Sequence, residues 1–307
     1  MNRKLSSELQ EMAISNLNEV PNRIKEDVEK IREWLQKQQH LPVKIDDDRL
    51  LAFLRGSKYS LQKTKEKIDY YFTLRTLTPE FYYTRDPLSP QIQAIINAGC
   101  LLPLPKPDTK TGAKIIIWYM NNSNPQTTPY LNLILVNFMV LDILMKECDN
   151  AVICGLKVLL ELTNCSAKYI TQISPGLLKK HLDSYVKGFP IRIKGFYVTN
   201  CPSYLEYACN LIKSLTKNKV AQRMTMHSDI ADLYDEIPQI LLPKELGGEN
   251  GSVEAIRVEW KQKIESYREW FLENKNYKSD ESLRSGSPRT LETTFGIEGS
   301  FRKLDLD

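Results

Sequence analysis

Residues 187–223, KGFPIRIKGFYVTNCPSYLEYACNLIKSLTKNKVAQR, decide the fold of this chain. They begin with a strand-like run, residues 191–199, in which side chains alternate between the two faces, so that Arg192 and Lys194 share one face. Pro202 then opens a helix. Its apolar residues follow a spacing of i, i+4, i+7 and i+11, which makes a single stripe, namely Tyr204, Ala208, Leu211 and Leu215. The stretch therefore predicts a strand followed by an amphipathic helix.

A basic cluster accompanies this helix. From residue 192 to residue 223, Glu206 is the one acidic residue among six basic ones, so the local charge is +5, against +4 for the whole chain. Lys219 and Arg223 are i,i+4 neighbours on one helix face. The cluster is compact and is interleaved with aliphatic residues rather than stacking aromatics, which argues against nucleic acid as a partner. A solvated helix face is the plain alternative, but an unpaired basic row favours binding of an anion.

The rest of the chain alternates in the same way. Residues 114–120 and 156–162 are short apolar runs of strand length, and residues 131–146 and 175–186 fit helices. Strands that alternate with helices predict an α/β domain with a mainly parallel sheet. A long amphipathic helix follows from Val253 to Phe271, and helical patterns at residues 18–39, 46–56 and from Ser60 precede the sheet.

These patterns divide the chain into four parts. We expect a small N-terminal helical domain at 1–84, a proline-rich connector at 85–105, the α/β domain at 106–275 and a polar, flexible tail at 276–307. With 42% hydrophobic and 26% charged residues the chain can bury a core. The longest apolar run, residues 131–145, is too short to span a bilayer, and no secretory signal opens the chain. We expect a cytoplasmic protein whose six cysteines stay reduced.

Catalytic motifs do not stand out in the sequence. The chain has three histidines, and neither His40 nor His181 has a cysteine or carboxylate at ligand spacing. There is no GxSxG elbow, no Walker sequence and no GxGxxG, and paired carboxylates such as Asp46 and Asp48 sit at a helix start, where capping explains them. The sequence therefore predicts a protein that is not an enzyme and that needs no metal or cofactor.

Several ordered motifs resemble one family. The N-terminal DDDRLLAFLRGSKYSLQKTKEKIDYYFTLR looks like the helical N-terminal segment of CRAL-TRIO lipid-binding proteins. The run ISPGLLKKHLDSYVKGFPIRIKGFYVTNCPSYLEYACNLIKSLTKNKVAQRMTMHSD and the later IPQILLPKELGGENGSVEAI resemble the lipid-binding domain of that family. The resemblance covers residues 20–272 and is greatest for the α-tocopherol transfer and cellular retinaldehyde-binding branch, particularly its insect members.

The resemblance implies an apolar pocket floored by the sheet and closed by a movable helix at residues 202–215. It implies a monomeric carrier of one hydrophobic small molecule, similar to a tocopherol, retinoid or carotenoid, that associates reversibly with membranes. It also implies a basic cleft for a phosphoinositide head group, which carries over to Arg55, Arg192, Lys194, Lys219 and Arg223. Two alternative functions are compatible with the same fold: a phosphatidylinositol or phosphatidylcholine exchange protein, and an interaction scaffold without ligand.

Pocket positions also carry over from the resemblance, with ordinary core packing as the alternative for each. They are Leu135, Met139, Leu156, Leu160, His181, Phe189, Phe196, Ala208 and Leu211. Two of this chain's residues depart from the tocopherol carriers, which have an apolar residue at His181 and a small hydroxyl residue at Asp142. A more polar pocket wall would suit a ligand with a hydrogen-bonding end.

Overall fold

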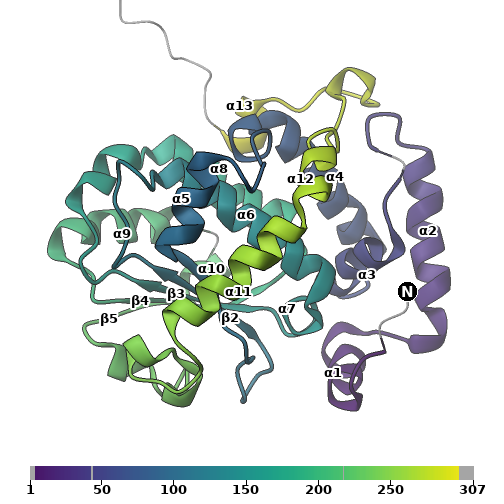
Figure 1. Cartoon of the computed structure of the whole chain (residues 1–307). Helices are drawn as coiled ribbons and strands as arrows, with labels where there is room; N and C mark the ends of the chain where they lie inside the picture. The colour runs from purple at the N-terminus through teal and green to yellow at the C-terminus, as the bar shows by residue number, and fades with distance from the viewer. Residues whose placement is uncertain (1–3, 43, 217, 297–307) are drawn as a thin grey trace, which may run out of the picture.

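The computed structural model describes residues 4–42, 44–216 and 218–296, and Figure 1 shows their arrangement. A helical unit precedes a sheet, as the sequence predicts, and the sheet has five strands instead of the three that the apolar runs indicate. The helices of this unit are α1 (Ser7–Leu17), α2 (Ile24–Gln36), α3 (Asp47–Gly56) and α4 (Leu61–Leu77). The strands are β1 (Leu101–Pro103), β2 (Lys114–Tyr119), β3 (Leu156–Glu161), β4 (Ile193–Thr199) and β5 (Met224–His227).

The sheet has the order β1-β2-β3-β4-β5. Only β1 is antiparallel to its neighbour, and the other three pairs are parallel. This confirms the predicted α/β fold with a mainly parallel sheet. The strands follow one another in sequence order, and right-handed crossovers then place the connecting helices on a single face. Those helices are α6 (Tyr130–Glu147), α7 (Asp149–Ile153), α8 (Pro175–Asp183), α9 (Glu206–Leu215) and α10 (Asn218–Ala221).

Alternation along the strands gives the sheet a helix-facing side that is almost wholly apolar. Ile116 lies opposite Val158, Trp118 lies opposite Leu160, and Phe196 continues the row on β4. The other face carries polar groups with partners. Lys157 Nζ lies 3.2 Å from a carboxylate oxygen of Asp108, and the far side is completed by short turns between residues 230 and 246 and by α11 (Val253–Ser266).

The proline-rich connector is more ordered than its composition suggests. It contains α5 (Pro90–Ala98) and the strand β1. Pro90 stands in the first turn of α5, where the missing amide proton costs nothing. Gly99 ends the helix with a φ of 66°, a left-handed conformation that glycine adopts without strain. The prolines at 87–107 therefore punctuate short elements instead of forming a loop.

A buried ionic cluster joins the helical unit to α6. Asp142, with 1% of its surface exposed, accepts hydrogen bonds from Tyr71 (2.7 Å), Arg75 (3.0 Å) and Arg85 (2.7 Å). Burial opposes ionisation of this carboxyl, but Arg75 and Arg85 hold its pKa at about 2. α6 is buried nearly all round, as predicted. None of the helices in the described part of the chain combines the length and the apolar character needed to cross a membrane.

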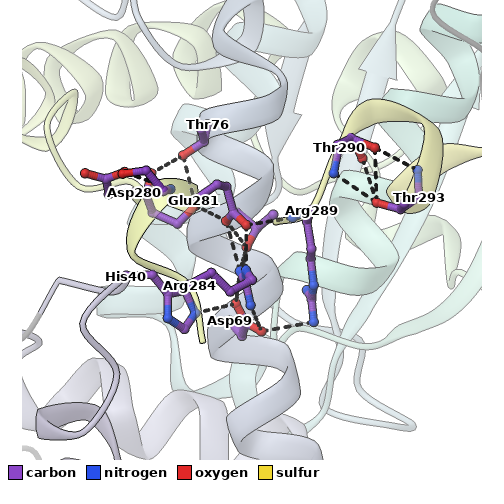
Figure 2. A network of polar contacts seen from close by, with 12 residues as sticks. His40, Asp69, Thr76, Asp280, Glu281, Arg284, Arg289, Thr290 and Thr293 are labelled. Carbon is purple, nitrogen blue, oxygen red and sulfur yellow. Dashed lines mark hydrogen bonds and ion pairs between the residues drawn. The ribbon is translucent and has the colours of Figure 1, made fainter. Parts of the chain in front are cut away.

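The segment after α12 (Arg268–Asn274) differs from the flexible tail that composition predicts. Figure 2 shows Arg284 and Arg289 converging on Asp69 of α4, with Arg284 donating at 2.7 and 2.9 Å. The chain continues into α13 (Leu291–Phe295), whose Phe295 is 1% exposed. Residues 276–296 are therefore held by ion pairs on α4, which composition alone does not reveal, and residues 297–307 lie outside the described part.

Candidate functional site

A cavity of about 140 Å³ lies between the apolar face of the sheet and the helices α6, α8 and α9. Leu156, Leu160 and Phe196 line it from the sheet, His181 lines it from α8 and Ala208 from α9. The structure thus brings these five predicted pocket residues to one enclosed space. Its wall is nearly all apolar, which suits a hydrophobic ligand.

Four other predicted pocket residues do not line this cavity. α6 presents a face with the spacing i, i+3, i+7 and i+11, made of Tyr130, Leu133, Asn137 and Leu141. Leu135 and Met139 lie two residues away from Leu133 and Asn137, which turns them about 200° around the helix. They are buried elsewhere in the core, as is Phe189, whose ring stacks on Phe138 at 5.4 Å. Leu211 is half-buried on α9 and does not line the cavity either.

The cavity wall has few polar groups. The hydroxyl of Tyr130 and Nδ1 of His181 are 3.1 Å apart, and burial lowers the pKa of His181 to about 4, so this imidazole is neutral. Asn137 is 5% exposed and lines the same space. The sequence pointed to His181 but not to Tyr130 or Asn137, although their spacing of seven on one helix would have placed them on a shared face. Asp142 belongs to the ionic cluster and does not line the cavity.

α9 forms an outer wall with two different sides. Ala208 and Cys209 are buried against the cavity, whereas Tyr207 is 68% exposed and Tyr204, in the turn just before the helix, is 45% exposed. The hydroxyl of Tyr204 donates a hydrogen bond of 2.7 Å to the carbonyl oxygen of Cys165. Among the described residues, one side-chain hydrogen bond therefore joins the start of α9 to the segment after β3, and large aromatic surface faces solvent beside it.

Three of the predicted basic residues, Arg192, Lys194 and Arg223, lie close together at one end of the sheet. Lys194 is exposed, and its pKa is lowered by partial burial and then by the charges of Arg192, Arg223 and Lys58. A second cavity, of about 280 Å³, is lined by Lys58, Arg192 and Lys194 together with Met12 and Leu17 of α1. Lys58 was not predicted, although it follows the FLRGS motif directly. Its left-handed backbone (φ 52°) turns it out of α3.

The other two predicted basic residues, Arg55 and Lys219, are not among the described residues that line this second cavity. Lys219 is exposed on α10. Arg55 is buried in an ion pair with Glu19, whose Oε2 lies 2.8 Å from its Nε. Arg192 bridges the two regions, since its Nη1 donates to the carbonyl oxygen of Arg55 at 2.9 Å. Gly56 approaches Pro190 so closely that a Cβ at residue 56 would lie 2.1 Å from the proline carbonyl oxygen. The absence of a side chain at Gly56 therefore lets the end of α3 lie against the residues just before β4.

Comparison with known proteins agrees with this architecture. Residues 100–248 match the model of the CRAL/TRIO domain, and residues 20–92 match the model described as Pinta-like, UBA domain. The chain is 27% identical over 252 residues to the alpha-tocopherol transfer protein-like of Mus musculus, covering 81% of this chain and 72% of the relative. It is 24% identical over 246 residues to clavesin-1 of Xenopus laevis, covering 80% of this chain and 74% of the relative.

Among solved structures, the fold is similar to the crystal structure of Sfh5. The TM-score is 0.46 at 12% sequence identity, over 82% of this chain and 92% of that one.

Proposed function

The chain belongs to the CRAL/TRIO family of lipid-binding proteins, and on this premise we propose that it is a non-enzymatic carrier of one hydrophobic small molecule. The observation that carries the proposal is the apolar cavity under α9. Its described lining has no Lys, Arg, Asp or Glu side chain. A hydrophobic ligand can therefore bind there without burying a charged side chain of the protein that has no partner. We propose a ligand similar to a tocopherol, a retinoid or a carotenoid.

Entry of such a cargo requires a wall to move. Sites for drug-sized ligands measure roughly 300–1,000 Å³, more than the 140 Å³ enclosed here. α9 is the wall best suited to move, because its outer side is solvent-exposed and the Tyr204 hydroxyl anchors its start by one hydrogen bond. A ligand that buries several hundred Å² of apolar surface gains about 10 kcal/mol before ordering costs. Release into water is therefore slow, and release to a bilayer is the natural exit.

We propose further that the basic residues bring α9 to such a bilayer. Each cation near an anionic leaflet contributes about 1 kcal/mol, so Arg192, Lys194, Lys219 and Arg223 together give roughly 4 kcal/mol, enough for reversible docking. A phosphoinositide head group is the anion that would engage most of them at once. Arg55 contributes to this surface indirectly, because its backbone carbonyl oxygen accepts a hydrogen bond from Arg192 and so positions that side chain.

Organic extraction of the native protein tests the carrier proposal directly. We expect mass spectrometry and an absorbance spectrum of the extract to show one hydrophobic small molecule at near-equimolar amount. A phospholipid in its place would favour the exchange-protein alternative. An empty protein that also fails to take up a hydrophobic probe would leave the scaffold alternative and overturn the carrier.

A vesicle-binding assay tests the membrane step. Lys194→Gln/Arg223→Gln removes two of the clustered cations and should weaken binding to vesicles that contain phosphatidylinositol bisphosphate by about 30-fold, the equivalent of roughly 2 kcal/mol. Ligand affinity in solution should not change. The matched control is Lys25→Gln/Lys37→Gln, the same charge change at two exposed positions on and beside α2, far from α9 in Figure 1. Equal losses in both variants would reduce the effect to net charge and remove the cluster's role.

A further inference from the structure

The few polar groups of the cavity wall restrict what the ligand can be. Tyr130, Asn137 and His181 all line the space beneath α9. The His181 ring meets the Tyr130 ring at 6.1 Å and the Phe138 ring at 5.7 Å, both nearly edge-on. It therefore lies along the stretch of α6 that carries Asn137. The aromatic contacts fix the plane of the imidazole, so its two nitrogens have set directions.

The hydroxyl of Tyr130 decides which nitrogen carries the proton. This phenol is buried, and burial raises its pKa, so it keeps its single proton. Within the described residues the one acceptor for that proton is Nδ1 of His181, at 3.1 Å. A buried donor left without an acceptor is costly, so the phenol donates to Nδ1. A neutral imidazole that accepts at Nδ1 carries its proton on Nε2.

Nε2–H of His181 is thus a donor without a partner among the described residues. His181 retains accessible surface although the imidazole is enclosed by protein. The residue lines the cavity, so a ligand held there lies beside it. Asn137 likewise makes no side-chain hydrogen bond within the described residues. Buried polar groups in native proteins are normally satisfied, and a ligand atom in the cavity would supply the partner that the described residues do not.

The same wall disfavours an anionic ligand. No Lys or Arg side chain is among the described lining residues, and an imidazole whose pKa is low in these apolar surroundings must first take up a proton before it can compensate a carboxylate or phosphate there. We infer that the cargo carries a neutral oxygen acceptor, such as a ketone, aldehyde or alcohol, that receives a hydrogen bond from His181 Nε2–H. This inference rests on the proposed carrier function and names the chemical class of its cargo.

Matched ligands and variants test it by displacement of the neutral fluorescent probe N-phenyl-1-naphthylamine. The ligands are undecane, 2-undecanone and undecanoate, and the variants are His181→Phe and, as a control wall change, Leu182→Met. We expect His181→Phe to weaken 2-undecanone five- to tenfold and to leave undecane unchanged. Leu182→Met should change both ligands alike. At pH 7 undecanoate should bind the native protein at least tenfold more weakly than the ketone.

The outcomes separate the two proposals. If His181→Phe weakens alkane and ketone equally, or if undecanoate binds best, the acceptor inference is overturned and the carrier stands. If neither the probe nor any ligand binds, the carrier proposal fails and the inference fails with it. Long-range ¹H–¹⁵N spectra give an independent readout, because the protein has three histidines and His181→Phe identifies the signal. A protonated Nε2 and an unprotonated Nδ1 are expected, and the reverse pattern would overturn the assignment.

Discussion

Glu19 holds Arg55 in a buried ion pair, with Oε2 2.8 Å from Nε and Oε1 3.3 Å from Nη2. Glu19 is 1% exposed and Arg55 is 6% exposed. The hydroxyl of Tyr59 donates a third hydrogen bond to this carboxylate at 2.7 Å. Burial alone would raise the pKa of Glu19, but Arg55 lowers it below its ordinary value. A cation that the resemblance gives to a phosphate is therefore already neutralised within the protein.

This pair predicts how Arg55 and Glu19 variants differ. Arg55→Gln leaves a buried carboxylate without its partner and should lower the free energy of unfolding by about 3–5 kcal/mol. The double variant Glu19→Gln/Arg55→Gln removes both charges and should recover most of that loss. Urea denaturation measures both. Vesicle binding by the double variant should equal that of the native protein. A loss as large as that of Lys194→Gln/Arg223→Gln would instead put Arg55 at the head group.

Loss of the charge of Asp142 should destabilise the fold. Among the described residues, its carboxylate alone pairs with both Arg75 and Arg85 in the buried cluster. Asp142→Asn leaves two buried guanidinium groups without compensation and should cost about 3–5 kcal/mol of unfolding free energy. Glu33→Gln, an equal charge change at an exposed position of α2, should stay within about 0.5 kcal/mol. Similar values for the two variants in urea denaturation would mean that the cluster does not hold α6 to the helical unit.

Asp142 also shows where sequence reasoning stopped. The alternation of strands and helices and the apolar stripe after Pro202 predicted the sheet and α9, because hydrophobic periodicity reports burial directly. Periodicity does not report which side of an all-apolar helix faces a cavity. The resemblance carried Leu135 over to the pocket wall and raised Asp142 as a polar departure there, while Tyr130 and Asn137, which do line the cavity, were passed over. Distant ion pairs such as Glu19–Arg55 leave no local signal at all.

The neutral state of His181 makes stability depend on pH. Burial lowers its pKa from 6.5 to about 4, so the unfolded chain binds a proton in this interval and the folded protein does not. Stability from this residue is complete above pH 6.5 and is lost as the pH falls toward 4, by about 1.4 kcal/mol per unit. His181→Phe should remove that slope from urea denaturation measured between pH 4.5 and 7. An unchanged slope would mean that the folded imidazole is protonated over this range.

The hydrogen bond of Tyr204 makes a kinetic prediction. Tyr204→Phe removes the 2.7 Å bond to the Cys165 carbonyl oxygen and keeps the ring. A net hydrogen bond is worth about 0.5–1.5 kcal/mol, so release of a fluorescent apolar probe to neutral vesicles should become about 2–10 times faster. Tyr207→Phe is the matched control, because its exposed hydroxyl makes no described hydrogen bond. Equal rates in both variants would exclude this contact as the anchor of α9.

The C-terminal segment was missed for a physical reason as well. Its composition is polar, and polar composition usually means that too little apolar surface is available to pay for ordering a chain. Here charge pairs at Asp69 supply the order, and Phe295 adds one buried aromatic ring. Lys187 then donates a 2.6 Å hydrogen bond to the carbonyl oxygen of Thr294. This ties the segment to the turn Ser184–Gly188, whose Tyr185 and Val186 line the cavity.

Asp69→Asn should therefore release this segment. Asp69 pairs with Arg284 and with Arg289 (3.0 Å), and its pKa is lowered by these arginines against the effect of burial. Without the carboxylate, local opening should become about 1–3 kcal/mol easier, which hydrogen exchange would record as amides of residues 281–295 exchanging about 5–150 times faster. Asp235→Asn, an exposed carboxylate on the other side of the sheet, should leave those amides unchanged. If both variants exchange at the native rate, Glu281 alone suffices to hold Arg284, and the contacts at Asp69 in Figure 2 do not order the segment.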